Sequence, residues 1–111
     1  MPGSAEPQDL LADRIRSALA GRDVREVRMF GGLSFMVDGS LIVSVSRDGG
    51  LLVRVDPARR DDLLARPGAR PAAMKNGREM GDGWLQVGAE GVDSDAAVRF
   101  WLHVGEAARP S

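Results

Sequence analysis

The residues whose types could do chemistry are few and widely spaced along this chain. His103 is the only histidine, so a Ser-His-Asp triad would have to use it. The candidate nucleophiles would be Ser34, Ser44 and Ser46. Helical spacing in the final segment places His103 on a polar arc beside Arg99 and Glu106, which favours a solvated surface histidine over a catalytic one.

Metal and acid–base chemistry are equally poorly supplied. The chain has no cysteine, which excludes disulfides, zinc–thiolate sites, iron–sulfur clusters and thiol catalysis. The carboxylates lack the spacing of an EF-hand loop. Asp61 and Asp62 are adjacent in a predicted helix, so their side chains point about 100° apart and are better explained as solvated charges. We therefore expect no catalytic residue, no metal site and no cofactor.

The glycine pair Gly31-Gly32 lies between two apolar runs, where a phosphate-binding loop is one interpretation. A P-loop or a Rossmann fingerprint needs a helix directly after its glycine-rich turn. Here residues 33–37 follow, and they alternate like a strand, so the nucleotide interpretation fails on context. The remaining interpretation is a bend or β-bulge, where glycine supplies a positive φ or allows close backbone approach.

Positive charge gathers in residues 66–79, where four basic residues precede the first acid, Glu79. These residues are Arg66, Arg70, Lys75 and Arg78. Such a loop could bind phosphate, RNA, DNA or an acidic protein surface, or it could simply be solvated. It holds no aromatic residue for base stacking, and Trp84 just beyond it is expected to face the core. The net charge of −1 argues against a dedicated electrostatic nucleic-acid binder.

A single domain must position these residues, because 111 residues suffice for one core. We expect a disordered tail over residues 1–8 and one domain over residues 9–108. No apolar run approaches the roughly 18–20 residues of a membrane-spanning helix. The N-terminus shows no signal-peptide pattern, so the cytoplasm is the expected compartment and no membrane association is expected.

Apolar periodicity predicts three helices, over residues 9–20, 57–65 and 93–107. Gly21 is placed to end the first, Asp56 to cap the second, and Asp93 or Ser94 to cap the third. Alternating apolar residues predict strands over 24–30, 33–37, 40–46, 51–55 and 84–87. Asp38-Gly39 predicts a two-residue type I′ hairpin, whereas residues 66–83 lack periodicity and are expected to form a long loop.

The second face of the predicted sheet carries apolar residues as well. Met29, Met36 and Ile42 are expected there, which would suit either covering helices or a homodimer contact. The predicted fold class is α+β. Its antiparallel β-sheet is a meander of three or four strands plus a late strand, packed with an N-terminal, a middle and a C-terminal helix.

The stretch R-x-M-F-G-G-x-x-F-x-V-D-G resembles the signature of the TfoX/Sxy family N-terminal domain. The matching residues are Arg28, Met29, Phe30, Gly31, Gly32, Phe35, Val37, Asp38 and Gly39. The strands of residues 41–56 fit the same family, as do Gly77, Arg78, Met80 and a terminal helix with Trp101. The resemblance covers roughly residues 9–108, which implies a stand-alone domain without the C-terminal domain of the full-length competence regulators.

This resemblance implies an α+β fold and a role related to competence or transcription. We expect a small non-enzymatic regulatory or protein-binding module that contacts a protein partner or itself as a homodimer. Met29, Phe30, Gly31 and Gly32, with Asp38 and Gly39, are expected to set backbone shape, and Arg28, Arg70, Lys75 and Arg78 to make contacts. The alternative is a nucleic-acid-binding accessory domain that uses the basic loop 66–79, with no small-molecule substrate in either case.

Overall fold

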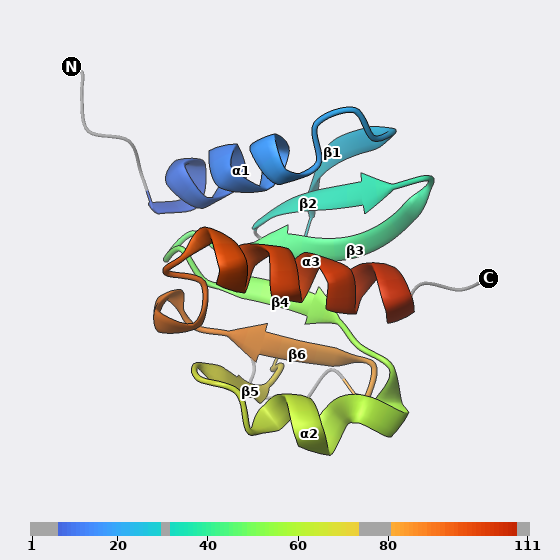
Figure 1. Ribbon diagram of the computed structural model, residues 1–111, viewed down its shortest axis with the longest axis vertical. Helices are drawn as coiled ribbons and strands as arrows, with labels where there is room; N and C mark the ends of the chain where they lie inside the picture. The colour runs from blue at the N-terminus through green and yellow to red at the C-terminus, as the bar shows by residue number, and fades with distance from the viewer. Residues whose placement is uncertain (1–6, 30–31, 74–80, 109–111) are drawn as a thin grey trace.

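The computed structural model describes residues 7–29, 32–73 and 81–108 (Figure 1). Its six strands form one antiparallel sheet in the order β1-β2-β3-β4-β6-β5, which confirms the predicted α+β class. The strands are β1 (Val24–Met29), β2 (Gly32–Val37), β3 (Ser40–Val45), β4 (Leu51–Arg54), β5 (Ala69–Pro71) and β6 (Trp84–Val87). The helices are α1 (Pro7–Ala18), α2 (Arg60–Leu64) and α3 (Asp95–Ala108), with the 3₁₀ turns η1 (Pro57–Arg59) and η2 (Ala89–Gly91).

The core lies between one face of the sheet and the two long helices. In Figure 1, α1 and α3 lie in front of the sheet. The short helix α2 lies beside β5, at one end of the sheet. The strand residues of the core pair across β2, β3, β4 and β6 in two rows. One row is Phe35, Val43, Val53 and Leu85, and the other is Leu33, Val45, Leu51 and Val87. Full burial of each such side chain contributes roughly 1.5–3 kcal/mol, so these rows are a major source of the stability.

The predicted turn and cap residues are confirmed. Asp38 and Gly39 have φ of 52° and 86° between β2 and β3, as a type I′ turn requires. The Asp56 side chain accepts a hydrogen bond from the Ala58 N–H at 3.0 Å, and the Ser94 hydroxyl accepts one from the Ala97 N–H at 3.1 Å. These local signals therefore fix where the hairpin, η1 and α3 begin.

The prediction that Ile42 lies on the second face was wrong. Phe35 pairs with Val43 but Met36 pairs with Leu41, so Ile42 is the extra residue of a β-bulge. Its side chain is fully buried, and its Cβ would lie 3.0 Å from a Cβ placed on Gly105 of α3. The bulge thus turns Ile42 toward α3 and places Leu41 opposite Met36.

Residues 66–83 were predicted to be a loop throughout, and this was wrong for Ala69–Pro71. These residues form β5, which pairs with β6 at the edge of the sheet. A strand of three residues is too short to show apolar alternation in the sequence. Pro71 argues further against a strand, although proline is compatible with an edge strand. Trp84 was expected in the core, but it pairs opposite Arg54 on the other face and is only half-buried.

The first helix begins earlier than predicted, inside the segment expected to be a tail. α1 starts at Pro7, and the Gln8 side-chain amide donates a hydrogen bond to the Val45 carbonyl at 2.9 Å. This contact fastens the start of α1 to the end of β3. Residues 1–6 of the predicted tail lie outside the described residues.

Position 32 requires a glycine because the backbone of β3 lies very close to it. Its φ is not in the left-handed region, whereas a Cβ at this position would lie 2.5 Å from the Val45 carbonyl oxygen and 3.0 Å from the Ser44 hydroxyl. The first strand of the hairpin therefore passes too near β3 for any side chain. Phe30 and Gly31, which were also expected to set the backbone shape, lie outside the described residues.

We predict that Gly32→Val destabilises the domain by about 1–3 kcal/mol, because the new Cβ must push against a backbone oxygen that cannot rotate away. Urea denaturation should show a lower midpoint. Gly83→Ala is the matched control, since its Cβ would meet only the Val55 carbonyl, at 4.0 Å. Equal stability of Gly32→Val and the wild type would contradict this explanation.

Candidate functional site

The two predicted contact arginines that the structure describes lie at opposite edges of the sheet. Arg28 is exposed on β1, and Arg70 is exposed on β5. Five strand-to-strand steps of about 4.8 Å separate these edges. Arg28 pairs opposite Leu33 on the helix side, whereas Arg70 pairs opposite Gln86 on the other side. Lys75 and Arg78 lie outside the described residues.

The face of the sheet away from α1 and α3, called here the outer face, has its own two rows of residues. One row is Val27, Ser34, Ser44, Leu52, Gln86 and Arg70, and the other is Arg25, Met36, Leu41, Arg54 and Trp84. Three of these residues are arginines and none is acidic. The outer face of the described strands is therefore basic, although the chain as a whole carries −1.

Two details order the outer face. The Ser34 hydroxyl donates a hydrogen bond to the Ser44 hydroxyl at 3.0 Å, and both serines are buried. The Arg54 guanidinium lies 4.9 Å from the centre of the Trp84 ring, and its Nε donates to the Leu41 carbonyl at 2.8 Å. Arg54 is thus held over the aromatic ring, and the cation–π contact helps to hold the tryptophan in place.

The residues considered for catalysis are not assembled by the described structure. His103 is exposed on α3, whereas Ser34 and Ser44 bond to each other on the outer face. Asp61 and Asp62 are both exposed on α2. In residues 7–29, 32–73 and 81–108, three or more potential metal ligands do not come together anywhere.

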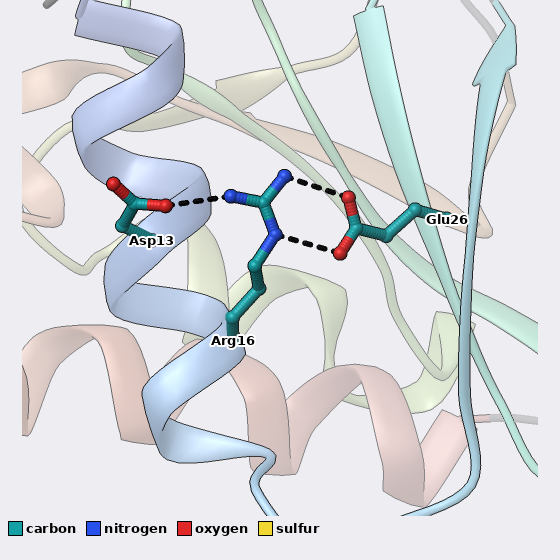
Figure 2. A network of polar contacts seen from close by, with 3 residues as sticks. All are labelled: Asp13, Arg16 and Glu26. Carbon is teal, nitrogen blue, oxygen red and sulfur yellow. Dashed lines mark hydrogen bonds and ion pairs between the residues drawn. The ribbon is translucent and has the colours of Figure 1, made fainter.

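The most developed polar contact of the surface joins α1 to the edge strand β1 (Figure 2). Arg16 of α1 donates two hydrogen bonds to the Glu26 carboxylate, each of 2.7 Å, and a third of 2.6 Å to Asp13. The hydrogen bonds from Arg16 hold the pKa of Glu26 below its ordinary value, and those to Glu26 raise the pKa of Arg16. Bidentate geometry makes this the strong form of an ion pair, although Arg16 is 44% exposed.

Two other arginines tie α1 and the turn after it to distant segments. Arg14 donates to the Val92 carbonyl at 2.8 Å and to Asp95, at the start of α3. Arg22 donates to Glu106 near the end of α3, and this bond raises the pKa of Arg22. Arg14, Arg16 and Arg22 were not singled out from the sequence, because their partners on other elements are between 10 and 84 residues away.

Two of the open hollows in the described part of the chain lie on the helix side. One, of about 270 Å³, lies between α1 and α3 beside Arg14 and Arg99. The other, of about 280 Å³, lies where the Arg66 guanidinium stacks on Phe100 at 3.9 Å from the ring centre. Both are smaller than the roughly 300–1,000 Å³ of ordinary ligand pockets. The candidate interaction surfaces are therefore the outer face and the β1 edge.

These features define a small α+β domain with α1 and α3 on one side of its sheet and, at one edge, β1, which pairs among the described strands with β2 alone. Its sequence matches the family model described as the TfoX N-terminal domain over residues 13–108. The chain belongs to that family, as the motif at Arg28–Gly39 had indicated. Searches of curated proteins and of solved structures found no significant match. None of the described helices is both long and apolar enough to cross a membrane.

We predict that Glu26→Gln lowers stability by about 0.5–1 kcal/mol at neutral pH, as expected for a partly exposed ion pair. The pKa of Glu26 is lower in the folded state, so its contribution is complete above the unfolded pKa of about 4.3 and disappears as the pH falls through the folded pKa. Urea denaturation at pH 7 and pH 3 should show that the difference between wild type and variant shrinks in acid. A constant difference would contradict the electrostatic origin. Asp82→Asn, at an exposed carboxylate, is the control.

Proposed function

We propose that this protein is a small, non-enzymatic binding module that acts through protein contacts, in the first place with a second copy of itself. The observation that carries the proposal is the outer edge of β1. This six-residue strand pairs with β2 on one side and with no strand of the described structure on the other. Unpaired strand edges offer backbone donors and acceptors to other chains, which is a recurrent mode of protein recognition.

The rest of the described surface supports binding over catalysis. The two hollows are smaller than ordinary ligand pockets, and His103 lies on α3 whereas Ser34 and Ser44 lie on the outer face. The family resemblance extends the proposal to a regulatory role in competence or transcription. That role rests on the family motif alone, and the fold itself names no pathway.

We predict that the purified chain forms a dimer whose population rises with concentration in the micromolar range. Size-exclusion chromatography with light scattering measures this directly, as a shift from the monomer mass of 11.9 kDa toward twice that value. A mass that remains monomeric at every concentration would remove self-association from the proposal. An interaction with a different protein would then have to be sought.

A second candidate function, nucleic-acid binding, is favoured by the basic outer face. Arg25, Arg54 and Arg70 lie on it without any acidic residue in the same rows, and the Arg54–Trp84 contact places a cation beside an aromatic ring. Single-stranded nucleic acids bind surfaces that combine arginine with aromatic side chains. This support comes from the outer face and not from the basic loop that the sequence predicted. Within that loop, the Arg66 guanidinium lies over the Phe100 ring.

For this candidate we predict that labelled single-stranded DNA or RNA binds at low salt and that the double charge reversal Arg25→Glu/Arg70→Glu weakens binding at least about tenfold. Fluorescence anisotropy provides the measurement. Arg99→Glu on the helix side is the control, because Arg99 is also exposed but lies on α3. Failure of the wild type to bind, or equal loss in both variants, would rule out the outer face as a nucleic-acid site.

A further inference from the structure

β1 presents alternate residues to its free edge, and the structure shows which ones. The Asp38 N–H donates to the Asp23 carbonyl at 3.0 Å, so these two residues form a hydrogen-bonded pair just before β1. In an antiparallel ladder such pairs alternate along the strand. The residues whose backbone groups face β2 are therefore Arg25, Val27 and Met29. Those whose backbone groups point away from the sheet are Val24, Glu26 and Arg28.

We propose that β1 pairs with β1 of a second copy, antiparallel, about a two-fold axis at Val27. This rests on the proposed self-association and specifies its surface and register. Both partners of a hydrogen-bonded pair must use outward backbone groups, so only the even-numbered residues can face one another in this way. The two-fold axis can therefore pass through any residue of the strand, but it cannot pass between two neighbouring residues.

Charge separates these registers. An axis at Glu26 sets Glu26 against its own copy, an axis at Arg28 sets Arg28 against its own copy, and an axis at Arg25 does the same for Arg25. An axis at Val27 instead sets Glu26 opposite Arg28 of the second copy, twice, and Val27 opposite Val27. Axes at the two strand ends, Val24 and Met29, set only one residue of β1 opposite its own copy, although an axis at Val24 also brings Asp23, just before the strand, opposite Arg25. Opposite charges across strands stabilise the pairing and like charges oppose it, so the axis at Val27 is the favoured one among the registers that pair several residues of the strand.

The side chains also lie on the correct face for this contact. Glu26 and Arg28 pair opposite Phe35 and Leu33, both in the core rows, so both project on the helix side of the sheet. Within the described residues Arg28 forms no ion pair, whereas Glu26 already receives Arg16. A carboxylate has about four acceptor sites, so it can receive a second guanidinium in addition. The dimer contact would extend the Asp13–Arg16–Glu26 network of Figure 2 into the second copy.

A second copy is favoured over an unrelated strand because of the symmetry of the charges. A two-fold axis requires the residue before the centre to complement the residue after it. Glu26 and Arg28 satisfy that requirement around Val27, and Arg25 falls opposite Met29, which carries no charge. An unrelated partner would place no such condition on β1.

The test is charge complementation between two variants. Arg28→Glu should set Glu26 against a new carboxylate, and Glu26→Arg should set two guanidinium groups together, so each alone should weaken dimerisation at least about tenfold. Mixed in equal amounts, the two variants restore opposite charges at both contacts and should form a heterodimer. Sedimentation velocity measures the masses, and circular dichroism checks that each variant is folded, since Glu26→Arg also removes the contact with Arg16.

Two further measurements separate this contact from general charge effects. Arg25→Glu is the matched control on the same strand, and it should leave the dimer intact because Arg25 faces Met29 of the second copy. Amide hydrogen exchange in the wild type should slow with rising concentration at Glu26 and Arg28, but not at Arg25 and Val27, whose amides already bond to β2.

Each outcome decides the proposal. A dimer that persists in Arg28→Glu and in Glu26→Arg overturns the β1 interface, while the proposed self-association stands on another surface. Equal loss in Arg25→Glu, or no heterodimer from the mixture of folded variants, overturns the register. A wild type that stays monomeric at its highest soluble concentration overturns both this inference and the homodimer. Monomeric single variants that combine into a heterodimer establish it.

Discussion

The pairing of β2 with β3 is the constraint on which the rest of the structure depends. Its tight turn sets the register at one end, and the close approach of Gly32 to the Val45 carbonyl sets it at the other. Between them, the bulge at Ile42 turns an additional side chain into the core. A one-residue slip would exchange the core rows for the outer face, so this pairing decides which side of every later strand is buried.

The same register decides what the surface offers. Because β1 pairs with β2 without a shift, the side chains of Glu26 and Arg28 share the helix side, and their backbone groups share the free edge. Arg16 then reaches across from α1 to Glu26, which holds the edge strand against the helix layer. The electrostatic contact and the unpaired backbone edge are therefore consequences of one hairpin geometry.

Much of this fold could be predicted from the sequence because its signals are local. The turn at Asp38-Gly39, the caps at Asp56 and Ser94, and the apolar alternation of β2 and β4 each act within a few residues. The failures have a shared cause. The bulge at Ile42, the strand β5 and the half-buried position of Trp84 are fixed by partners elsewhere in the chain.

The candidate surfaces were predictable to a smaller degree. Arg28 was singled out by the family motif, but its role as an edge residue follows only from strand order. The basic outer face gathers arginines from β1, β4 and β5, which are widely separated in sequence. No window of sequence contains such a surface, since a sheet assembles it from single positions on each strand. For the same reason, the sequence did not indicate the bridging roles of Arg14 and Arg16 in α1 and of Arg22 in the following turn.

An edge strand with alternating charges would serve the monomer and the proposed dimer in different ways. Charged residues on an edge discourage random pairing, because half of the two-fold registers of β1 bring like charges together. Around Val27, however, the order of charges favours one self-pairing register, whereas axes at Arg25, Glu26 or Arg28 would set like charges against each other. A six-residue strand contact is small, so the resulting dimer should be weak and responsive to concentration and salt. Weak, specific self-association of this kind suits a regulatory module better than a permanent assembly does, because its population can change with the amount of protein present.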